Sequence, residues 1–179
     1  MLNKILVAID DSAASDWAFE TALEMAKSLE ASLLLVHVLD AFSPTSPKHP
    51  SLLVESFSMD TEGPAQQAYE QEWQQFTNRY DTLLKQKQSD AEAVGVTSTY
   101  VQTQGIPGRA ICEIAKVNNI DLIVVGNHDR TNQKDLDNGS VSNYLVHHAP
   151  CSVTVIHPKA GQADFSQTED SRLVSAGRA

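Results

Sequence analysis

The stretch Lys4-Ile5-Leu6-Val7-Ala8-Ile9, followed by Asp10-Asp11-Ser12, decides the fold. Its unbroken aliphatic and β-branched character predicts a strand covered on both faces, as in parallel sheets. The polar triplet ends the strand, and Ser12 is suited to cap a following helix. Up to Glu30, apolar residues recur at the spacing of an amphipathic helix, at Ala18, Ala22, Met25, Ala26 and Leu29. The segment therefore predicts a buried strand and a helix that packs on its sheet.

The alternation of strand and helix continues through the chain. Further strands are predicted at 32–38, 96–103, 121–126 and 152–156, and helices at 66–93, at 107–117 and from about 139 to Pro150. The strand at 96–103 is less apolar than the others and is expected near a sheet edge. The aromatic residues of the long helix are expected in the core: Tyr69, Trp73, Phe76 and Tyr80. A polar, proline-containing excursion occupies 40–63.

Five strands alternating with helices predict an α/β fold with a doubly wound parallel sheet and right-handed crossovers. Ligands of such sheets bind at the carboxyl ends of the strands, where the strand order reverses. We therefore expect the functional residues to follow the first, second and fourth strands.

Composition limits the partners and the location of the protein. The length of 179 residues predicts one domain, at 1–158, and the aperiodic residues 159–179 are expected to form a disordered tail. The formal net charge of −10 opposes binding to nucleic acid or anionic lipid. No apolar stretch has the length of a membrane span, and the first residues lack the features of a signal peptide. We expect a cytoplasmic protein with no nucleic-acid or membrane partner, and with Cys112 and Cys151 reduced.

The segment after the fourth strand contains the residues best suited to bind an anion. Gly126 ends that strand, and Gly139-Ser140 opens the last helix. Glycine lets a backbone approach a ligand closely, and a helix start offers free backbone N–H groups and a positive dipole end to a phosphate. Glycine and serine are also common helix caps in proteins without a ligand, so this pair alone fits either role.

These features together resemble the universal stress protein family over residues 1–158. The run Ile5 to Ser12 is similar to the first strand and turn of that family, with Asp11 where the family has glycine. The segments Leu35-Val36-His37-Val38 and Gly105-Ile106-Pro107 also agree with the family pattern. The nucleotide-binding signature of the family is Gly, two residues, Gly, nine residues, then Gly and Ser or Thr. Its spacing is met here by Gly126, Gly139 and Ser140, with Asp129 in place of the second glycine.

The resemblance implies a Rossmann-like fold of the adenine nucleotide alpha hydrolase type, with strand order 3-2-1-4-5. It also implies a homodimer joined through the last strand and an ATP site. By position, the adenine and ribose side would be lined by Ala8, Ile9 and Asp10, and the base would contact Val38. The ribose and phosphates would be surrounded by Gly126, Arg130, Gly139, Ser140, Val141 and Ser142.

Two of these residues have an alternative role. Asp10 is also suited to a turn, and Ser140 to an ordinary helix cap. The carboxylate of Asp129 either repels the triphosphate or holds Mg²⁺ that bridges to phosphate oxygens.

The sequence indicates at most a weak ATPase. It contains no Walker A pattern, and no spacing identifies a nucleophile with its base. The leading hypothesis is therefore a dimeric, ATP-binding regulator of a stress response. The alternative is a family member that does not bind nucleotide and works as a dimeric module for a protein partner.

Overall fold

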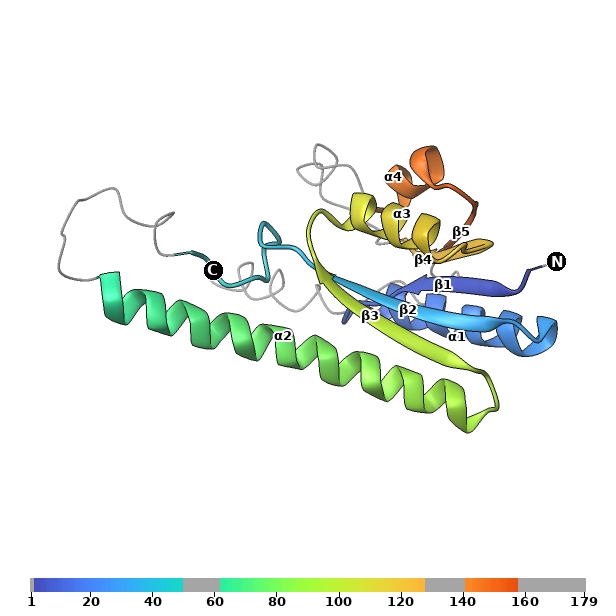
Figure 1. The fold of residues 1–179 in the computed structure, drawn as a ribbon, viewed down its shortest axis with the longest axis horizontal. Coiled ribbons are helices and arrows are strands. Elements are labelled where there is room, and N and C mark those ends of the chain that lie inside the picture. The colour runs from blue at the N-terminus through green and yellow to red at the C-terminus, as the bar shows by residue number, and fades with distance from the viewer. Residues whose placement is uncertain (1, 50–61, 128–140, 158–179) are drawn as a thin grey trace, which may run out of the picture.

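The structure, a computed structural model, describes residues 2–49, 62–127 and 141–157. Its elements are β1 (Lys4–Ala8), α1 (Ala13–Leu29), β2 (Ser32–Leu39), α2 (Glu62–Ala93), β3 (Ser98–Gln104), α3 (Pro107–Val117), β4 (Leu122–Gly126), α4 (Val141–His148) and β5 (Ser152–Ile156). The strands form one parallel sheet in the order β3-β2-β1-β4-β5 (Figure 1). The predicted fold class and strand order are confirmed, and β3 lies at an edge as its composition predicts.

The sheet separates two apolar clusters. Helices α1 and α2 cover one face and α3 and α4 the other, as Figure 1 shows. Residues of β1 alternate between the faces: Ile5 and Val7 belong to the first cluster and Leu6 to the second. All three are fully buried. The apolar run that opens the sequence thus occupies the centre of the sheet, with helices on both sides.

Helix α1 begins as the sequence predicts. Ser12 has an extended backbone, and its Oγ accepts a hydrogen bond from the N–H of Ser15 at 3.1 Å. This bond satisfies one of the N–H groups that the first turn of a helix leaves unpaired. The helix ends at Leu29, and the following Glu30 adopts a left-handed conformation with φ of 53°. The residues that lead from β1 into α1 are therefore fixed by local hydrogen bonds.

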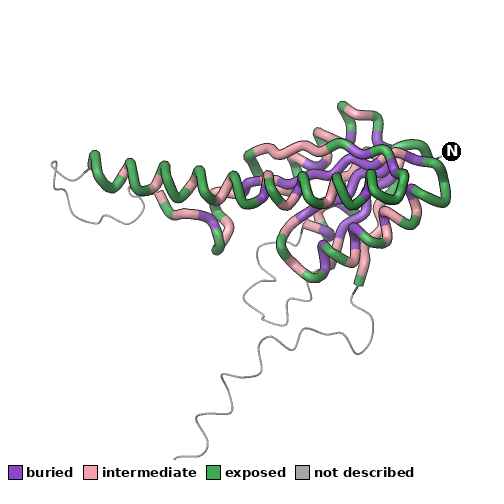
Figure 2. Tube along the Cα trace, turned by 90° about the horizontal axis from the view of Figure 1, so that it is seen from below, coloured by how far each residue is buried: buried purple, intermediate pink, exposed green. Residues whose placement is uncertain are grey.

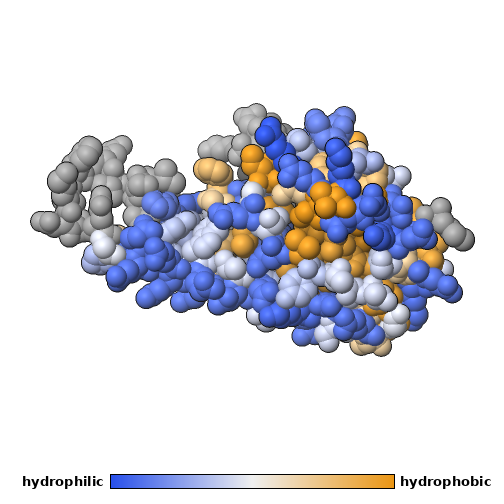
Figure 3. Space-filling model, in the orientation of Figure 1, coloured by the Kyte–Doolittle hydropathy of each residue, from blue (hydrophilic) through white to orange (hydrophobic). Residues whose placement is uncertain are grey.

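Helix α2 extends well beyond the sheet. Its first residue, Glu62, lies four positions before the predicted start at Gln66. Only its carboxyl-terminal half packs on the sheet, through the buried Tyr80, Leu84 and Ala91. In Figures 2 and 3 the protruding half is largely exposed and hydrophilic. The expectation of core aromatics is correct for Tyr80, whereas Tyr69, Trp73 and Phe76 are only half-buried and lie outside the apolar cluster on that face of the sheet.

The remaining predictions concern segments that the structure describes only in part. Residues 40–49 of the excursion form turns, in which the Oγ of Ser46 donates to the carbonyls of Ala41 and Ser43 at 2.8 Å each. The rest of the excursion, up to residue 61, and the tail at 159–179 lie outside the described residues. None of the helices described is long and apolar enough to cross a membrane.

Candidate functional site

Seven of the predicted site residues lie where the strand order reverses. Ala8 ends β1, Gly126 ends β4, and β1 pairs with β4 on one side and with β2 on the other. The others follow β1, lie near the end of β2 or open α4: Ile9, Asp10, Val38, Val141 and Ser142 are placed there. Because all strands are parallel, these segments meet at one edge of the sheet. The other four, Asp129, Arg130, Gly139 and Ser140, lie outside the described residues.

The turn after β1 is held by hydrogen bonds that involve Asp10. Its Oδ1 accepts from the backbone N–H of Ser12 at 2.9 Å and from the Ser12 hydroxyl. Its own N–H donates to Oγ of the buried Ser15 at 2.9 Å. The N–H of Ile9 donates to the carbonyl of Val36 at 2.8 Å, which continues the pairing of β1 with β2. Asp10 therefore has the turn role that the sequence allowed, and this role fixes its carboxylate at the edge of the sheet.

Gly126 is in close contact with helix α1. A β-carbon added at this position would lie 2.3 Å from the carbonyl oxygen and 2.5 Å from the carbonyl carbon of Ala14. The sequence predicts that Gly126 allows a ligand to approach the backbone closely, and the structure gives a second reason for glycine at this position. The first turn of α1 packs directly on the end of β4, and only glycine leaves room for it.

Asn127 connects the elements around the site, although sequence analysis gave it no role. Its N–H donates to the carbonyl of Ile156 at 2.7 Å, and its Nδ2 lies 3.1 Å from Nδ1 of His157. Its Oδ1 accepts from Oγ of the buried Ser142 at 3.4 Å. Asn127 thus joins the ends of β4 and β5 to the first turn of α4. Its position directly after the signature glycine was the signal that could have identified it.

His37 forms a buried contact behind the turn. The side chain is 6% exposed, and its Nδ1 lies 2.6 Å from the carbonyl oxygen of Ile9. Its ring stacks on Tyr80 of α2, with 3.8 Å between ring centroids and 11° between planes. Burial lowers the pKa of His37 below its usual 6.5, against smaller opposing effects of the Ile9 carbonyl, Asp10 and Asp11. The imidazole is therefore neutral at pH 7.

Comparison with known proteins identifies the family. A family model described as "Universal stress protein family" matches residues 1–157. The chain belongs to the universal stress protein family. A universal stress protein of Synechocystis sp. is 41% identical over 91 residues, which cover 50% of this chain and 83% of that protein.

Solved structures of universal stress proteins have the same fold. UspA from Lactobacillus plantarum is 25% identical and has a TM-score of 0.63, covering 87% of this chain and 97% of that one. A family protein from Arabidopsis thaliana with AMP bound is 22% identical and has a TM-score of 0.60. That match covers 92% of this chain and 97% of the Arabidopsis chain.

In this universal stress protein, Asp11 stands where the family pattern has glycine. Its Oδ2 accepts a hydrogen bond from the guanidinium of Arg79 on α2, and the two side chains form an ion pair. Both are substantially exposed, so the pair contributes little to stability. The ion pair instead connects the turn after β1 to α2. A second connection runs from the carbonyl of Ile9 through His37 to Tyr80 of α2.

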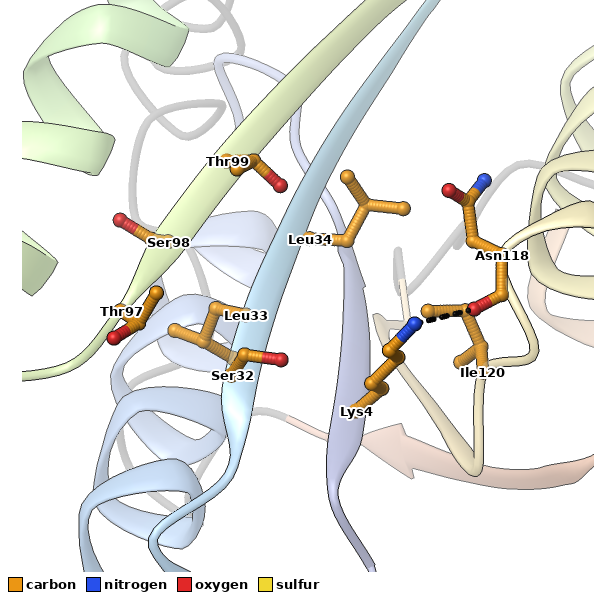
Figure 4. A pocket seen from close by; sticks show the side chains of 9 residues that line it. All are labelled: Lys4, Ser32, Leu33, Leu34, Thr97, Ser98, Thr99, Asn118 and Ile120. Atoms are coloured by element: carbon orange, nitrogen blue, oxygen red, sulfur yellow. Dashed lines mark hydrogen bonds between the residues drawn. The ribbon is translucent and has the colours of Figure 1, made fainter.

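The described residues also form a cavity far from the carboxyl ends of the strands. A cavity of about 200 Å³ lies at the opposite edge, at the amino ends of the strands (Figure 4). Nζ of Lys4 donates there to the carbonyl of Asn118 at 3.1 Å, and none of the predicted site residues lines the cavity. In the described part of the chain, no group of three or more His, Cys, Asp or Glu side chains could hold a metal ion.

Proposed function

We propose that this universal stress protein binds an adenine nucleotide, ATP in the leading hypothesis, and acts as a cytoplasmic, dimeric regulator of a stress response. The observation that carries the proposal is the convergence of Asp10, Val38 and Ser142 with Gly126 at the point where the strand order reverses. The likeness to a structure with AMP bound supports the same class of ligand.

The chemistry of these residues suits a nucleotide. Val38 is half-buried and presents an apolar side chain on which a purine base can rest. Asp10 supplies a carboxylate of fixed position, which can accept hydrogen bonds from ribose hydroxyls. Signature residues Gly139 and Ser140 directly precede α4, whose positive end favours phosphate. The Asp129 carboxylate would bind Mg²⁺, which in turn would bind phosphate oxygens.

We propose that hydrolysis of the nucleotide is slow or does not occur. The two hydrogen bonds that Asp10 accepts from Ser12 give its carboxylate a structural role in the turn. A general base, by contrast, must reach the proton that it abstracts in the bound substrate. The nucleotide would then act as a regulatory ligand.

Nucleotide binding is tested first on the natural protein. Freshly purified protein is heat-denatured and its supernatant is analysed for nucleotides by mass spectrometry, and nucleotide-free protein is titrated with ATP with and without Mg²⁺. We expect ATP to bind, with an affinity that rises when Mg²⁺ is present. Absence of binding under both conditions would contradict the proposal.

Gly139→Val is expected to weaken ATP binding by at least about tenfold, because its branched side chain obstructs the approach of the phosphates. The matched control is Gly63→Val, since a β-carbon at Gly63 has no neighbour within 4 Å. The control should bind like the natural protein, and circular dichroism should show both variants folded. Equal ATP affinity of Gly139→Val and the control would remove Gly139 from the site.

The alternative function, a dimeric module for a protein partner, is favoured by Asp129 at the position of a signature glycine. It predicts that the natural protein does not bind ATP and that Asp129→Gly creates affinity. The leading hypothesis predicts instead that Asp129→Gly binds ATP with less dependence on Mg²⁺. The two functions are therefore separated by one variant measured under the same two conditions.

We further propose that β5 joins two copies of the chain. β5 pairs only with β4 among the described strands, so one edge carries backbone groups that are available for pairing. Its residues Val153, Thr154, Val155 and Ile156 are half-buried in the single chain. A second copy related by a two-fold axis would cover the same edge of both chains.

Thr154→Lys is expected to shift the dimer toward monomer, because it places two like charges near the axis. Sedimentation velocity at several protein concentrations measures the change, and we expect at least about a tenfold weaker association. Thr99→Lys, on the opposite edge strand β3, is the matched control and should remain dimeric. A natural protein that sediments as a monomer at all concentrations would contradict the proposal.

A further inference from the structure

His37 lies where three parts of the protein meet. It belongs to β2, its Nδ1 is 2.6 Å from the carbonyl oxygen of Ile9, and its ring stacks on Tyr80 of α2. The carbonyl oxygen of Ile9 can only accept a hydrogen bond, so Nδ1 carries the proton and donates it. In the neutral ring Nε2 then has a lone pair, and this buried atom has no hydrogen-bond partner in the described structure. Burying a polar atom without a hydrogen-bond partner lowers the stability of the folded protein. The position of Nε2 therefore needs an explanation.

The bond from His37 fixes one particular peptide. The carbonyl of Ile9 and the N–H of Asp10 belong to the same planar peptide group. His37 holds its oxygen, and Oγ of Ser15 holds its N–H at 2.9 Å. With both polar groups held from opposite ends, the peptide cannot rotate without breaking a hydrogen bond. The orientation of Asp10 at the edge of the sheet follows from this constraint.

We propose that His37 is a positioning residue for nucleotide binding: it sets the Ile9–Asp10 peptide from behind the site and makes nucleotide affinity depend on pH. This inference rests on the proposed nucleotide site and names how that site is regulated. His37 does not touch the ligand. It acts through the backbone that carries Asp10, and the stack on Tyr80 holds its ring in the plane that the bond to Ile9 requires.

The surroundings of His37 determine the sign of the pH dependence. The charged or titratable groups near it are Asp10 and Asp11 of the turn, and Tyr80 and Arg79 of α2. Burial raises the pKa of Tyr80 above 10, so its phenol remains neutral, and Asp11 is paired with Arg79. As the pH falls through the lowered pKa of His37, Nε2 gains a proton for which the described structure provides no acceptor.

Protonation therefore favours a movement of the ring that breaks the bond to Ile9 or the stack on Tyr80. Because the pKa of His37 is lower in the folded protein than in the unfolded chain, its contribution to stability is present above pH 6.5. That contribution is lost as the pH falls. The same direction is expected for nucleotide affinity, which should be constant near pH 7.5 and decrease toward pH 5.5.

Two variants separate the contributions of the side chain. His37→Phe keeps a ring that stacks on Tyr80 but removes the donor to Ile9. His37→Asn keeps an N–H group at the position of Nδ1 but removes the group that titrates. ATP affinity is measured by calorimetry at pH 7.5 and 5.5 for the natural protein and both variants, after circular dichroism has shown which of them fold.

Because the pKa of His37 lies below 6.5, we expect the natural protein to bind ATP more weakly at pH 5.5 than at 7.5, by up to about tenfold. At pH 7.5 His37→Phe should bind at least about tenfold more weakly than the natural protein, and His37→Asn within about threefold of it. The terminal phosphate of ATP also titrates in this range, so the decrease in affinity between the two pH values should be smaller for His37→Asn than for the natural protein, rather than absent. This smaller pH dependence is the result that a merely structural role of His37 would not produce.

The outcomes distinguish this inference from the proposed function. If the natural protein binds no ATP at either pH, the proposed function fails and the inference fails with it. If the natural protein binds ATP but His37→Phe binds equally well at pH 7.5, only the inference is overturned. If His37→Phe does not fold, the pH profile of His37→Asn decides, and a profile equal to that of the natural protein overturns the inference.

Discussion

Replacing Gly126 with alanine is expected to lower the free energy of unfolding by about 3 kcal/mol. The added β-carbon would lie 2.3 Å from the carbonyl oxygen of Ala14, and real β-carbons do not approach so closely. That oxygen belongs to the first turn of α1, so relief requires the whole helix to move away from the end of β4. Urea denaturation followed by circular dichroism measures the loss.

Two other glycines provide controls for this prediction. At Gly63 a β-carbon has no neighbour within 4 Å, so Gly63→Ala should leave stability unchanged or slightly raised. At Gly108 the nearest atoms belong to the Tyr144 side chain, 2.6 Å away, which can rotate aside more easily than a backbone. Gly108→Ala should therefore cost less than Gly126→Ala. An unfolding midpoint of Gly126→Ala equal to that of the natural protein would contradict the close contact with α1.

Leu84→Ala is expected to lower the free energy of unfolding by about 3 to 5 kcal/mol. Leu84 is fully buried in the cluster that α1 and α2 form with the sheet. The other buried residues of α2 are Tyr80 and Ala91. Truncation of Leu84 therefore leaves a cavity between α2 and the sheet and removes much of the apolar contact that holds the helix there. Urea denaturation and thermal unfolding both measure the effect, and the protruding half of α2 should lose helix content before the rest.

Leu29→Ala serves as the matched control, because Leu29 is 48% exposed at the end of α1. The same chemical change there should cost less than about 1 kcal/mol. If the two leucine variants lost equal stability, Leu84 would not anchor α2 as the structure indicates.

The sheet could be predicted from the sequence because its strands carry their own signal. The run Lys4 to Ile9 is apolar along its whole length, and the structure places a strand at Lys4–Ala8. The start of α2 was less predictable. Its first turns protrude beyond the sheet, so no apolar period marks residues 62–65. Apolar residues recur at helical spacing only where one face of a helix is buried, so the exposed first turn of α2 shows no such spacing.

The location of the site could also be predicted, since parallel strands place their carboxyl ends at one edge. This rule alone predicts that Asp10, Val38 and Gly126 lie close together. The contacts themselves could not be predicted. Gly126 meets Ala14, and His37 bonds to Ile9, across long stretches of chain. Such contacts depend on how elements pack in three dimensions, and a lone histidine in a strand gives no local sign of its partner.

The central place of β1 has a consequence for the synthesis of the protein. β1 is synthesised before the other described strands, yet it pairs on one side with β4, which follows three helices and two other strands in the chain. Until β4 has left the ribosome, the nascent β1-α1-β2-α2-β3 segment exposes an unpaired edge of β1 and the apolar surface that β4 will cover. Non-local parallel pairing forms slowly and leaves such edges open to aggregation. Chaperone demand should therefore peak before residue 126 emerges and fall once β4 can complete the centre of the sheet.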